Sequence, residues 1–246
     1  MLHLYALQFR PQFGAVERNL SSVLEYLKEV KEDSLVLLPE MWQCGFDYEN
    51  MKKHAQATGE VLEEIKRVSV QKSLTVAGTY PVQESGRLYN MAILAHKGKE
   101  LGRRAKIKLF PLYEEQKHFS PGKEKAVFES PFGRLGFLVC FELRFPELSF
   151  ELRRAKVHIV LVPAMWGRKR KEHFTTLCRA RAIELQSFLL CANVWGKVGE
   201  EEYAGSSAIY GPWGELLAFC EEGDSLLHAR VELKEVEKVR RHIPMP

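Results

Sequence analysis

Residues 135–147, LGFLVCFELRFPE, decide the fold, because an apolar run stops there at a single cysteine and turns into a helix start. The run at 135–139 is bounded by Gly133 and predicts a buried strand. Pro146 suits the first turn of a following helix, since the NH that proline lacks has no intrahelical partner there. Cys140 is therefore expected where strand becomes helix. A helix N-terminus favours thiolate, although cysteine is also among the residue types most often buried in a core.

The rest of the chain alternates between apolar runs and amphipathic segments. Turns are expected at 97–99 and 211–214, and a loop at 110–122. Mixed strands with flanking helices predict an α/β fold, a two-sheet sandwich with helices on the outer faces. The expected strands are 2–9, 34–38, 74–80, 91–96, 104–109, 135–139, 158–163, 188–194, 206–210, 216–219 and 225–231, and the expected helices are 16–30, 61–68, 171–186 and one that starts near 146.

Composition predicts one globular domain over residues 1–246, with 46% hydrophobic and 28% charged residues and no Pro-, Gly- or Ser-rich linker. No basic leader or long apolar stretch is visible, so we expect a cytoplasmic protein without a membrane partner. The five cysteines are widely spaced and form no Cys-x-x-Cys pair, which argues against a disulfide framework and a zinc site. We expect neither a metal nor a cofactor.

The formal net charge of +4 raises the question of a nucleic-acid partner. The densest basic run is Arg168-Lys169-Arg170-Lys171. However, 32 acidic residues nearly balance 36 basic ones, no nucleic-acid-binding motif is present, and a solvated helix start accounts for four exposed cations. The sequence therefore predicts no nucleic-acid partner.

Three residues with suitable chemistry end predicted strands: Glu40, Lys108 and Cys140. The carboxyl edge of an open α/β sheet is where ligands bind. Taken separately, Glu40 and Lys108 would be read as ordinary surface charges. A Cys/His site is disfavoured, because His118 and His173 stand in no recognisable partner motif.

Five segments around these residues follow one another along nearly the whole chain: Leu38-Pro39-Glu40-Met41, Lys106-Ile107-Lys108-Leu109-Phe110, residues 139–147, Arg179-Ala180-Arg181-Ala182-Ile183-Glu184 and Pro212-Trp213-Gly214-Glu215. In order and spacing they resemble the nitrilase, or carbon-nitrogen hydrolase, superfamily. The resemblance implies an αββα sandwich, a homodimer or higher homo-oligomer formed through the helical face, and a catalytic set of Glu, Lys and Cys, here Glu40, Lys108 and Cys140.

Each implied role has a chemical reason. Cys140 would attack an amide carbonyl and form a thioester, while Glu40 would act as general base and then as acid. Lys108 and the backbone NH of Phe141 would stabilise the oxyanion. A second glutamate is frequent four residues before a Pro-Gly loop, and Glu115 fits that position better than Glu114.

Two further residues are candidates for substrate binding. Arg144 lies four residues after the cysteine, where some relatives that hydrolyse carbamoyl groups use arginine to hold a substrate carboxylate. A structural salt bridge with Glu142 or Glu147 is an equal alternative. Trp166 ends a strand at the same sheet edge, and is expected either in the pocket wall or in the core.

The resemblance implies an amidohydrolase that releases ammonia from a small aliphatic amide. The ω-amidase group, which acts on 2-oxo acid amides such as 2-oxoglutaramate, is the leading expectation. Hydrolysis of N-carbamoyl amines or amino acids is the first alternative and nitrilase activity the second. From another class, a catalytically silent nitrilase-like binding partner is also considered.

Overall fold

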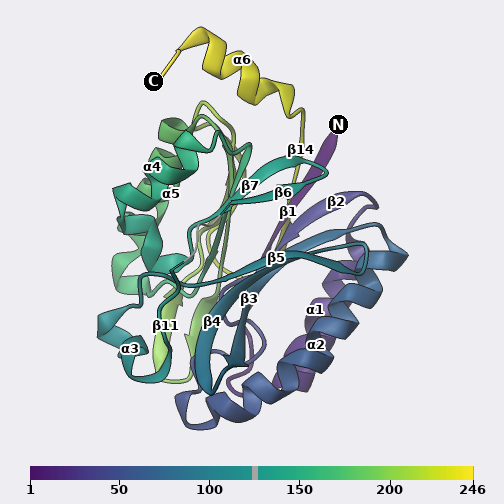
Figure 1. The fold of residues 1–246 in the computed structure, drawn as a ribbon, viewed down its shortest axis with the longest axis vertical. Helices are drawn as coiled ribbons and strands as arrows, with labels where there is room; N and C mark the ends of the chain where they lie inside the picture. Colours follow the sequence, from purple (N-terminus) through teal and green to yellow (C-terminus); the bar gives the residue numbers. More distant parts are fainter. Residues whose placement is uncertain (124–126, 246) are drawn as a thin grey trace.

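Two mixed sheets pack face to face between two layers of helices in the computed structural model, which describes residues 1–123 and 127–245 (Figure 1). The first sheet has the strand order β14-β1-β2-β3-β4-β5 and the second β13-β12-β9-β8-β7-β6. The first sheet contains β1 (Leu2–Gln8), β2 (Ser34–Leu37), β3 (Thr75–Glu84), β4 (Arg87–His96), β5 (Lys99–Ala105) and β14 (Ser225–Val231). The second contains β6 (Val127–Ser130), β7 (Gly133–Phe137), β8 (Ile159–Ala164), β9 (Phe188–Asn193), β12 (Ser207–Tyr210) and β13 (Leu216–Cys220).

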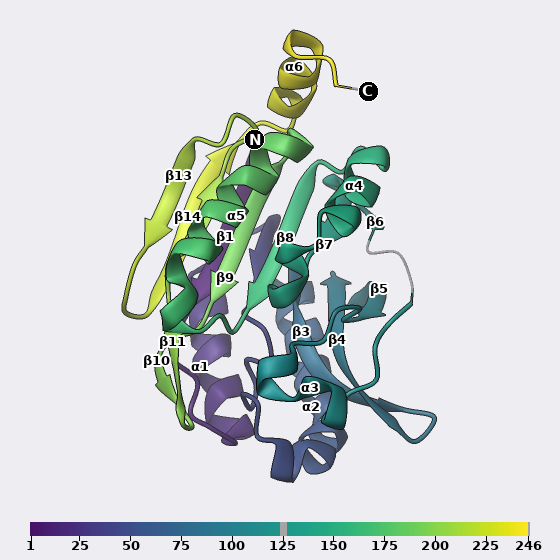
Figure 2. The same cartoon turned by 90° about the vertical axis from the view of Figure 1, so that its left-hand side faces the viewer.

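Helices cover the outer face of each sheet. The pair α1 (Val16–Glu29) and α2 (Met51–Gln71) lies on the first sheet, and α4 (Pro146–Arg154) and α5 (Lys171–Leu185) lie on the second, where Figure 2 shows them in front of β7, β8 and β9. The remaining elements are α3 (Glu115–His118), α6 (Lys234–His242), the hairpin β10 (Trp195–Val198) and β11 (Glu201–Ala204), and the 3₁₀ turns η1 (Tyr48–Asn50), η2 (Pro111–Tyr113), η3 (Cys140–Arg144) and η4 (Arg168–Arg170).

Strand β1 shows why the layers form. Its alternate side chains Leu4 and Ala6 enter the core between the sheets, whereas Tyr5 and Leu7 pack with Val23 and Leu27 of α1 on the other face. Both faces of this strand are therefore apolar, as expected for a strand buried between two layers. Among the described residues, no helix is long and apolar enough to cross a membrane.

The predicted α/β sandwich with outer helices is confirmed. The strand predicted at 225–231 has the same bounds as β14, and Pro146 opens α4 as expected. The prediction of a loop at 110–122 is wrong, because this segment contains η2 and α3. Two elements were not predicted, namely α6 after β14 and the hairpin β10–β11.

The hairpin predicted at 91–109 exists, but its second strand is misplaced. Strand β5 runs from Lys99 to Ala105, so the chain has left the sheet before Lys108. The Lys106 NH still bonds to the Asn90 carbonyl, but the next NH, of Ile107, donates to the Glu142 carboxylate across the sandwich. This hydrogen bond ties the chain just beyond β5 to Glu142 of the turn that follows β7.

Candidate active site

Glu40 and Cys140 lie at one edge of the sandwich, each just after a strand of the inner layers. Glu40 follows β2 and is fully buried. Cys140 begins η3 after β7, is 7% exposed and has a φ of +47°, in the left-handed region that non-glycine residues rarely occupy. The sharp change of direction at Cys140 takes the chain from the strand into η3.

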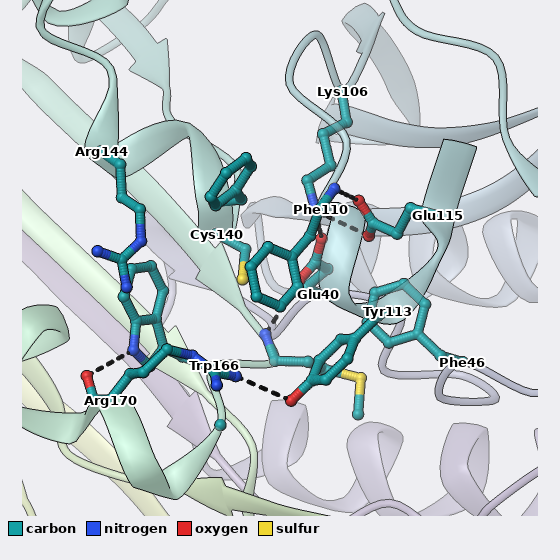
Figure 3. Close-up of a pocket in the computed structure, with 13 residues that line it drawn as sticks. Glu40, Phe46, Lys106, Phe110, Tyr113, Glu115, Cys140, Arg144, Trp166 and Arg170 are labelled. Atoms are coloured by element: carbon teal, nitrogen blue, oxygen red, sulfur yellow. Dashed lines mark hydrogen bonds and ion pairs between the residues drawn. The ribbon is translucent and has the colours of Figure 1, made fainter. Parts of the chain in front are cut away.

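A buried lysine bridges Glu40 and a second glutamate. Lys106 Nζ lies 2.8 Å from Glu40 Oε1 and 2.8 Å from Glu115 Oε1, and its side chain is 1% exposed (Figure 3). Glu40 also accepts hydrogen bonds from the Asn90 side-chain amide (2.8 Å) and the Met165 NH (3.1 Å). The Glu40 carboxylate is thus fixed by three donors.

Glu115 lies in the first turn of α3 and reaches Lys106, while Glu114 lies on the surface. Besides its contact with Lys106, Glu115 accepts the Phe110 NH at 2.6 Å. The short helix α3 therefore closes one side of the cluster.

The structure does not bring Lys108 to this cluster, which corrects the predicted position of the lysine. Lys108 is 35% exposed, pairs with Glu147 at 3.2 Å and lies over the Phe145 ring. Alternation along an extended strand would point Arg104, Lys106 and Lys108 the same way, but β5 ends at Ala105. Lys106 therefore remains inward and Lys108 turns out.

The electrostatics of the cluster keep the thiol protonated in the resting site. Burial, followed by the negative charge of Glu40, raises the pKa of Cys140 well above its usual value, and Lys106 opposes this shift. The expectation that a helix N-terminus favours thiolate is therefore wrong here, because desolvation is the larger effect. Burial also opposes the charged form of Lys106, but Glu115 and Glu40 outweigh it and raise the pKa of that ammonium.

A third glutamate, Glu142, holds the backbone on both sides of the cluster. Its fully buried carboxylate accepts the Val139 NH at 2.7 Å and the Ile107 NH at 2.5 Å, and it is paired with Arg104. Val139 precedes Cys140 and Ile107 follows Lys106. One side chain thereby sets the spacing of the thiol and the ammonium.

The cluster forms the floor of a pocket of about 310 Å³. Its walls are aromatic, and Phe141, which follows the cysteine, packs with its ring against Phe110 and Phe145. Such a small pocket, mostly apolar with polar groups at one end, suits a ligand of a few heavy atoms. The lining residues are Glu40, Phe46, Lys106, Phe110, Tyr113, Glu115, Cys140, Phe141, Arg144, Met165, Trp166, Gly167 and Arg170.

Both predicted substrate-binding residues, Arg144 and Trp166, line the pocket. Arg144 Cζ lies 4.6 Å from the centre of the Trp166 ring, and a guanidinium nitrogen of Arg144 is 3.2 Å from His173 Nδ1. The alternative of a salt bridge with Glu142 or Glu147 is wrong, because these carboxylates pair with Arg104 and Lys108. Trp166 lines the pocket and, at 3% exposure, also packs in the hydrophobic core, so both of its predicted positions describe it.

Besides Lys106, the pocket contains a second cation that was not predicted from the sequence, Arg170. It was expected among four solvated cations, but its neighbours Arg168 and Lys171 pair with surface glutamates, whereas Arg170 lies against Phe110 and Tyr113 inside the pocket mouth (Figure 3). The sequence held one indication of this position, because Arg170 follows closely after Trp166, a candidate for the pocket wall.

The described residues contain no group of three or more His, Cys, Asp or Glu side chains arranged to hold a metal ion. Of the two histidines weighed from the sequence, His118 stacks on Tyr48 and His173 contacts Arg144. The charged groups beside the Cys140 thiol are the carboxylates of Glu40 and Glu115 and the ammonium of Lys106.

Comparison with known proteins identifies the family of this chain. The model of the carbon-nitrogen hydrolase family matches residues 6–241. The 2-oxoglutaramate amidase of Bacillus subtilis (strain 168) is 30% identical over 243 residues, which cover 97% of this chain and 94% of that protein. The omega-amidase NIT2 of Xenopus tropicalis is 27% identical over 242 residues, which cover 92% of this chain and 87% of the relative.

Solved structures share the fold. A CN-hydrolase superfamily protein of Xanthomonas campestris superposes with a TM-score of 0.92 at 24% identity, covering 99% of this chain and 95% of the other. Saccharomyces cerevisiae Nit3, a member of the nitrilase superfamily, has a TM-score of 0.89 at 21% identity and covers 99% and 94%. The chain belongs to the carbon-nitrogen hydrolase family and is a hydrolase of carbon–nitrogen bonds.

Proposed function

We propose that this protein is an ω-amidase that hydrolyses the terminal amide of a small 2-oxo acid, such as 2-oxoglutaramate, and releases ammonia. The observation that carries the proposal is the buried thiol of Cys140 beside Glu40 and Lys106, at the floor of a pocket whose mouth holds arginine. The similarity to the 2-oxoglutaramate amidase of Bacillus subtilis and to the omega-amidase NIT2 of Xenopus tropicalis supports the same substrate class.

The first half of the reaction forms a thioester. Glu40 accepts the proton of the Cys140 thiol as sulfur bonds to the amide carbon, and the carbonyl electron pair moves onto oxygen. Lys106 Nζ and the Phe141 NH stabilise this oxyanion, a contribution of about 3 kcal/mol for each preorganised donor. The oxyanion then collapses, the carbon–nitrogen bond breaks, and Glu40 returns the proton to the departing ammonia.

The second half regenerates the enzyme. Glu40 accepts a proton from a water molecule whose oxygen attacks the thioester carbon, and the same donors stabilise the second oxyanion. Collapse releases the carboxylic acid and the Cys140 sulfur, which regains its proton from Glu40. Glu115 keeps Lys106 aligned throughout, because it holds the ammonium from the other side at 2.8 Å.

The test is ammonia release from 2-oxoglutaramate, glutamine, carbamoyl-β-alanine, carbamoylputrescine and simple nitriles, with Cys140→Ala run in parallel. We expect release from 2-oxoglutaramate that the variant lacks, and an acyl adduct on Cys140 in mass spectra of the quenched reaction. Preferred hydrolysis of a carbamoyl compound or a nitrile would contradict the ω-amidase proposal. Unchanged activity of Cys140→Ala would contradict the thioester.

We also propose a homodimer formed through the α5 face. The large apolar side chains Ile183, Leu216 and Phe219 on α5 and β13 are 47%, 55% and 45% exposed, which is unusual for such residues. Sedimentation of the protein, with Leu216→Glu as the variant, tests this. We expect the variant to sediment as a monomer, and a monomeric parent protein would contradict the proposal.

A further inference from the structure

Two arginines from different elements meet at the mouth of the pocket. Arg144 ends η3 and lies over Trp166, while Arg170 ends η4 and lies 5.3 Å from the centre of the Phe110 ring (Figure 3). Both line the same pocket as the Cys140 thiol. Any substrate with its amide at the thiol therefore extends toward two guanidinium groups.

Neither arginine has a carboxylate partner within residues 1–123 and 127–245. Their neighbours do, since Arg168 pairs with Glu202 and Glu222 and Lys171 pairs with Glu221. Burial and then the positive charge of Arg170 lower the pKa of Arg144, which shows that the two cations repel one another. An anionic group placed between them would remove this repulsion.

The fold holds the Arg170 head in place through several contacts. Its Nη2 donates to Tyr113 Oη at 3.2 Å, the same hydroxyl lies 3.2 Å from Glu201 Oε2, and the Arg170 carbonyl accepts the Trp166 indole NH at 2.7 Å. Gly167 leaves the room for this arrangement, because a Cβ there would lie 2.6 Å from Arg170 Nη2 and 2.8 Å from Tyr113 Oη. A guanidinium fixed in this way is preorganised for ligand binding.

We propose that Arg144 and Arg170 together bind the carboxylate and the neighbouring 2-oxo oxygen of the substrate, and that Arg170 is the residue that selects 2-oxo over 2-amino acid amides. The inference rests on the proposed ω-amidase function. Guanidinium groups only donate hydrogen bonds, so they suit carboxylate and oxo oxygens. A protonated 2-amino group would bring a third positive charge and no acceptor to the same place, and glutamine is therefore disfavoured.

The experiment measures kcat/KM of four amides with Arg170→Gln, Arg170→Lys and Lys169→Gln. The amides are 2-oxoglutaramate, glutaramate, which lacks the oxo group, glutamine, and uncharged pentanamide. Lys169 is the matched control, because it is an exposed cation beside Arg170 that does not line the site pocket. Thermal unfolding of each variant is measured alongside.

We expect Arg170→Gln to lower kcat/KM for 2-oxoglutaramate about 10-fold or more, as for a substrate that loses a charged hydrogen-bond partner. Pentanamide should change less than about 3-fold. The ratio of 2-oxoglutaramate to glutamine should fall about 10-fold, because the variant no longer repels the 2-amino group of glutamine. Arg170→Lys should restore part of this ratio, because it keeps the charge but not the planar fork. Lys169→Gln should leave all four values unchanged.

Two results would overturn the inference while leaving the proposed function intact. One is an unchanged ratio of 2-oxoglutaramate to glutamine in Arg170→Gln, and the other is an equal loss for all four amides, which would show a merely structural role. Failure of the parent protein to release ammonia from any of the four would instead overturn the proposed function, and the inference with it.

Discussion

Two buried ionic clusters lie side by side in this protein, built from alternate residues of one segment. Arg104 pairs with Glu142, and Lys106 pairs with both Glu40 and Glu115. In the first cluster one cation meets one carboxylate, and that carboxylate also accepts two backbone NH groups. In the second, two carboxylates share one ammonium and face a thiol in a pocket.

The difference between the clusters separates a structural role from a chemical one. Burial opposes the charged form of both Glu142 and Glu115, but Arg104 and the backbone bonds overcome it at Glu142 and hold its pKa below the usual value. At Glu115 desolvation prevails over Lys106, and the pKa is raised. The Arg104–Glu142 cluster, with one cation for one carboxylate, is the balanced cluster and keeps its charges fixed. The Lys106 cluster, with two carboxylates for one cation, is the unbalanced cluster and is able to exchange a proton with a substrate or thiol.

The largest expected effect separates Lys106 from Lys108. Lys106→Met should lower kcat by about 10³-fold, because it removes an oxyanion donor and the cation between two carboxylates. Lys108→Met makes the same chemical change two residues further on and should lower kcat less than about 3-fold, because this side chain points away from the pocket. Rates of ammonia release, with circular dichroism to verify folding, measure both. A comparable loss in the two variants would remove the distinction.

The next largest effect concerns the contribution of the Arg104–Glu142 cluster to the free energy of unfolding. Arg104→Met should lower the free energy of unfolding by about 3–5 kcal/mol, because it leaves the buried Glu142 without its cation. The control is Arg103→Met, whose pairs with Glu84 and Glu100 are partly exposed and should contribute less than about 1 kcal/mol. Urea unfolding followed by fluorescence measures both, and equal losses would refute the role of the buried pair.

A smaller effect should appear in the pH dependence of stability. The pKa of Glu142 is lowered in the folded state, so its contribution is present above the ordinary carboxyl pKa and is lost as the pH falls through the folded value. The pKa of Glu115 is raised, so its contribution is present below the ordinary value and is lost as the pH rises through the folded one. Replacing each by Gln should therefore change the slope of stability against pH in opposite directions.

Urea midpoints from about pH 3 to 7 measure these slopes, since this interval spans the usual carboxyl range. The parent protein is the reference, and each variant is compared with it at the same urea and salt concentrations. Slopes that shift in the same direction for Glu115→Gln and Glu142→Gln would contradict the contrast between the two clusters.

The smallest effect is expected at Lys108, the third of the alternate residues Arg104, Lys106 and Lys108. Its pair with Glu147 is partly exposed on both sides, so a double-mutant cycle with Lys108→Met and Glu147→Gln should give a coupling of less than about 1 kcal/mol. Added salt should reduce this coupling further. A coupling of several kcal/mol would show that the pair is not a surface contact.

Most of the central strands and several residues of the site could be predicted from the sequence. Apolar runs identified the central strands, including 225–231, because a strand buried on both faces needs no distant information to be recognised. The LGFLVCFELRFPE stretch located Cys140 and the helix beginning at Pro146. Glu40 was identified by its place after a predicted strand, and Glu115 only through the family resemblance; both lie in the cluster.

Only the tertiary structure shows that Lys106 lines the pocket in place of Lys108, and that Arg170 does so among its basic neighbours. Lys106 and Lys108 are equivalent in the sequence pattern, and the end of β5 separates them through a bond from the Ile107 NH to Glu142, 35 residues away along the chain. Arg170 differs from its basic neighbours only in facing the pocket, while Arg168 and Lys171 face surface glutamates. Local sequence determines the periodicity of a segment, but where a strand stops and which way a long side chain turns depend on partners that only folding brings near.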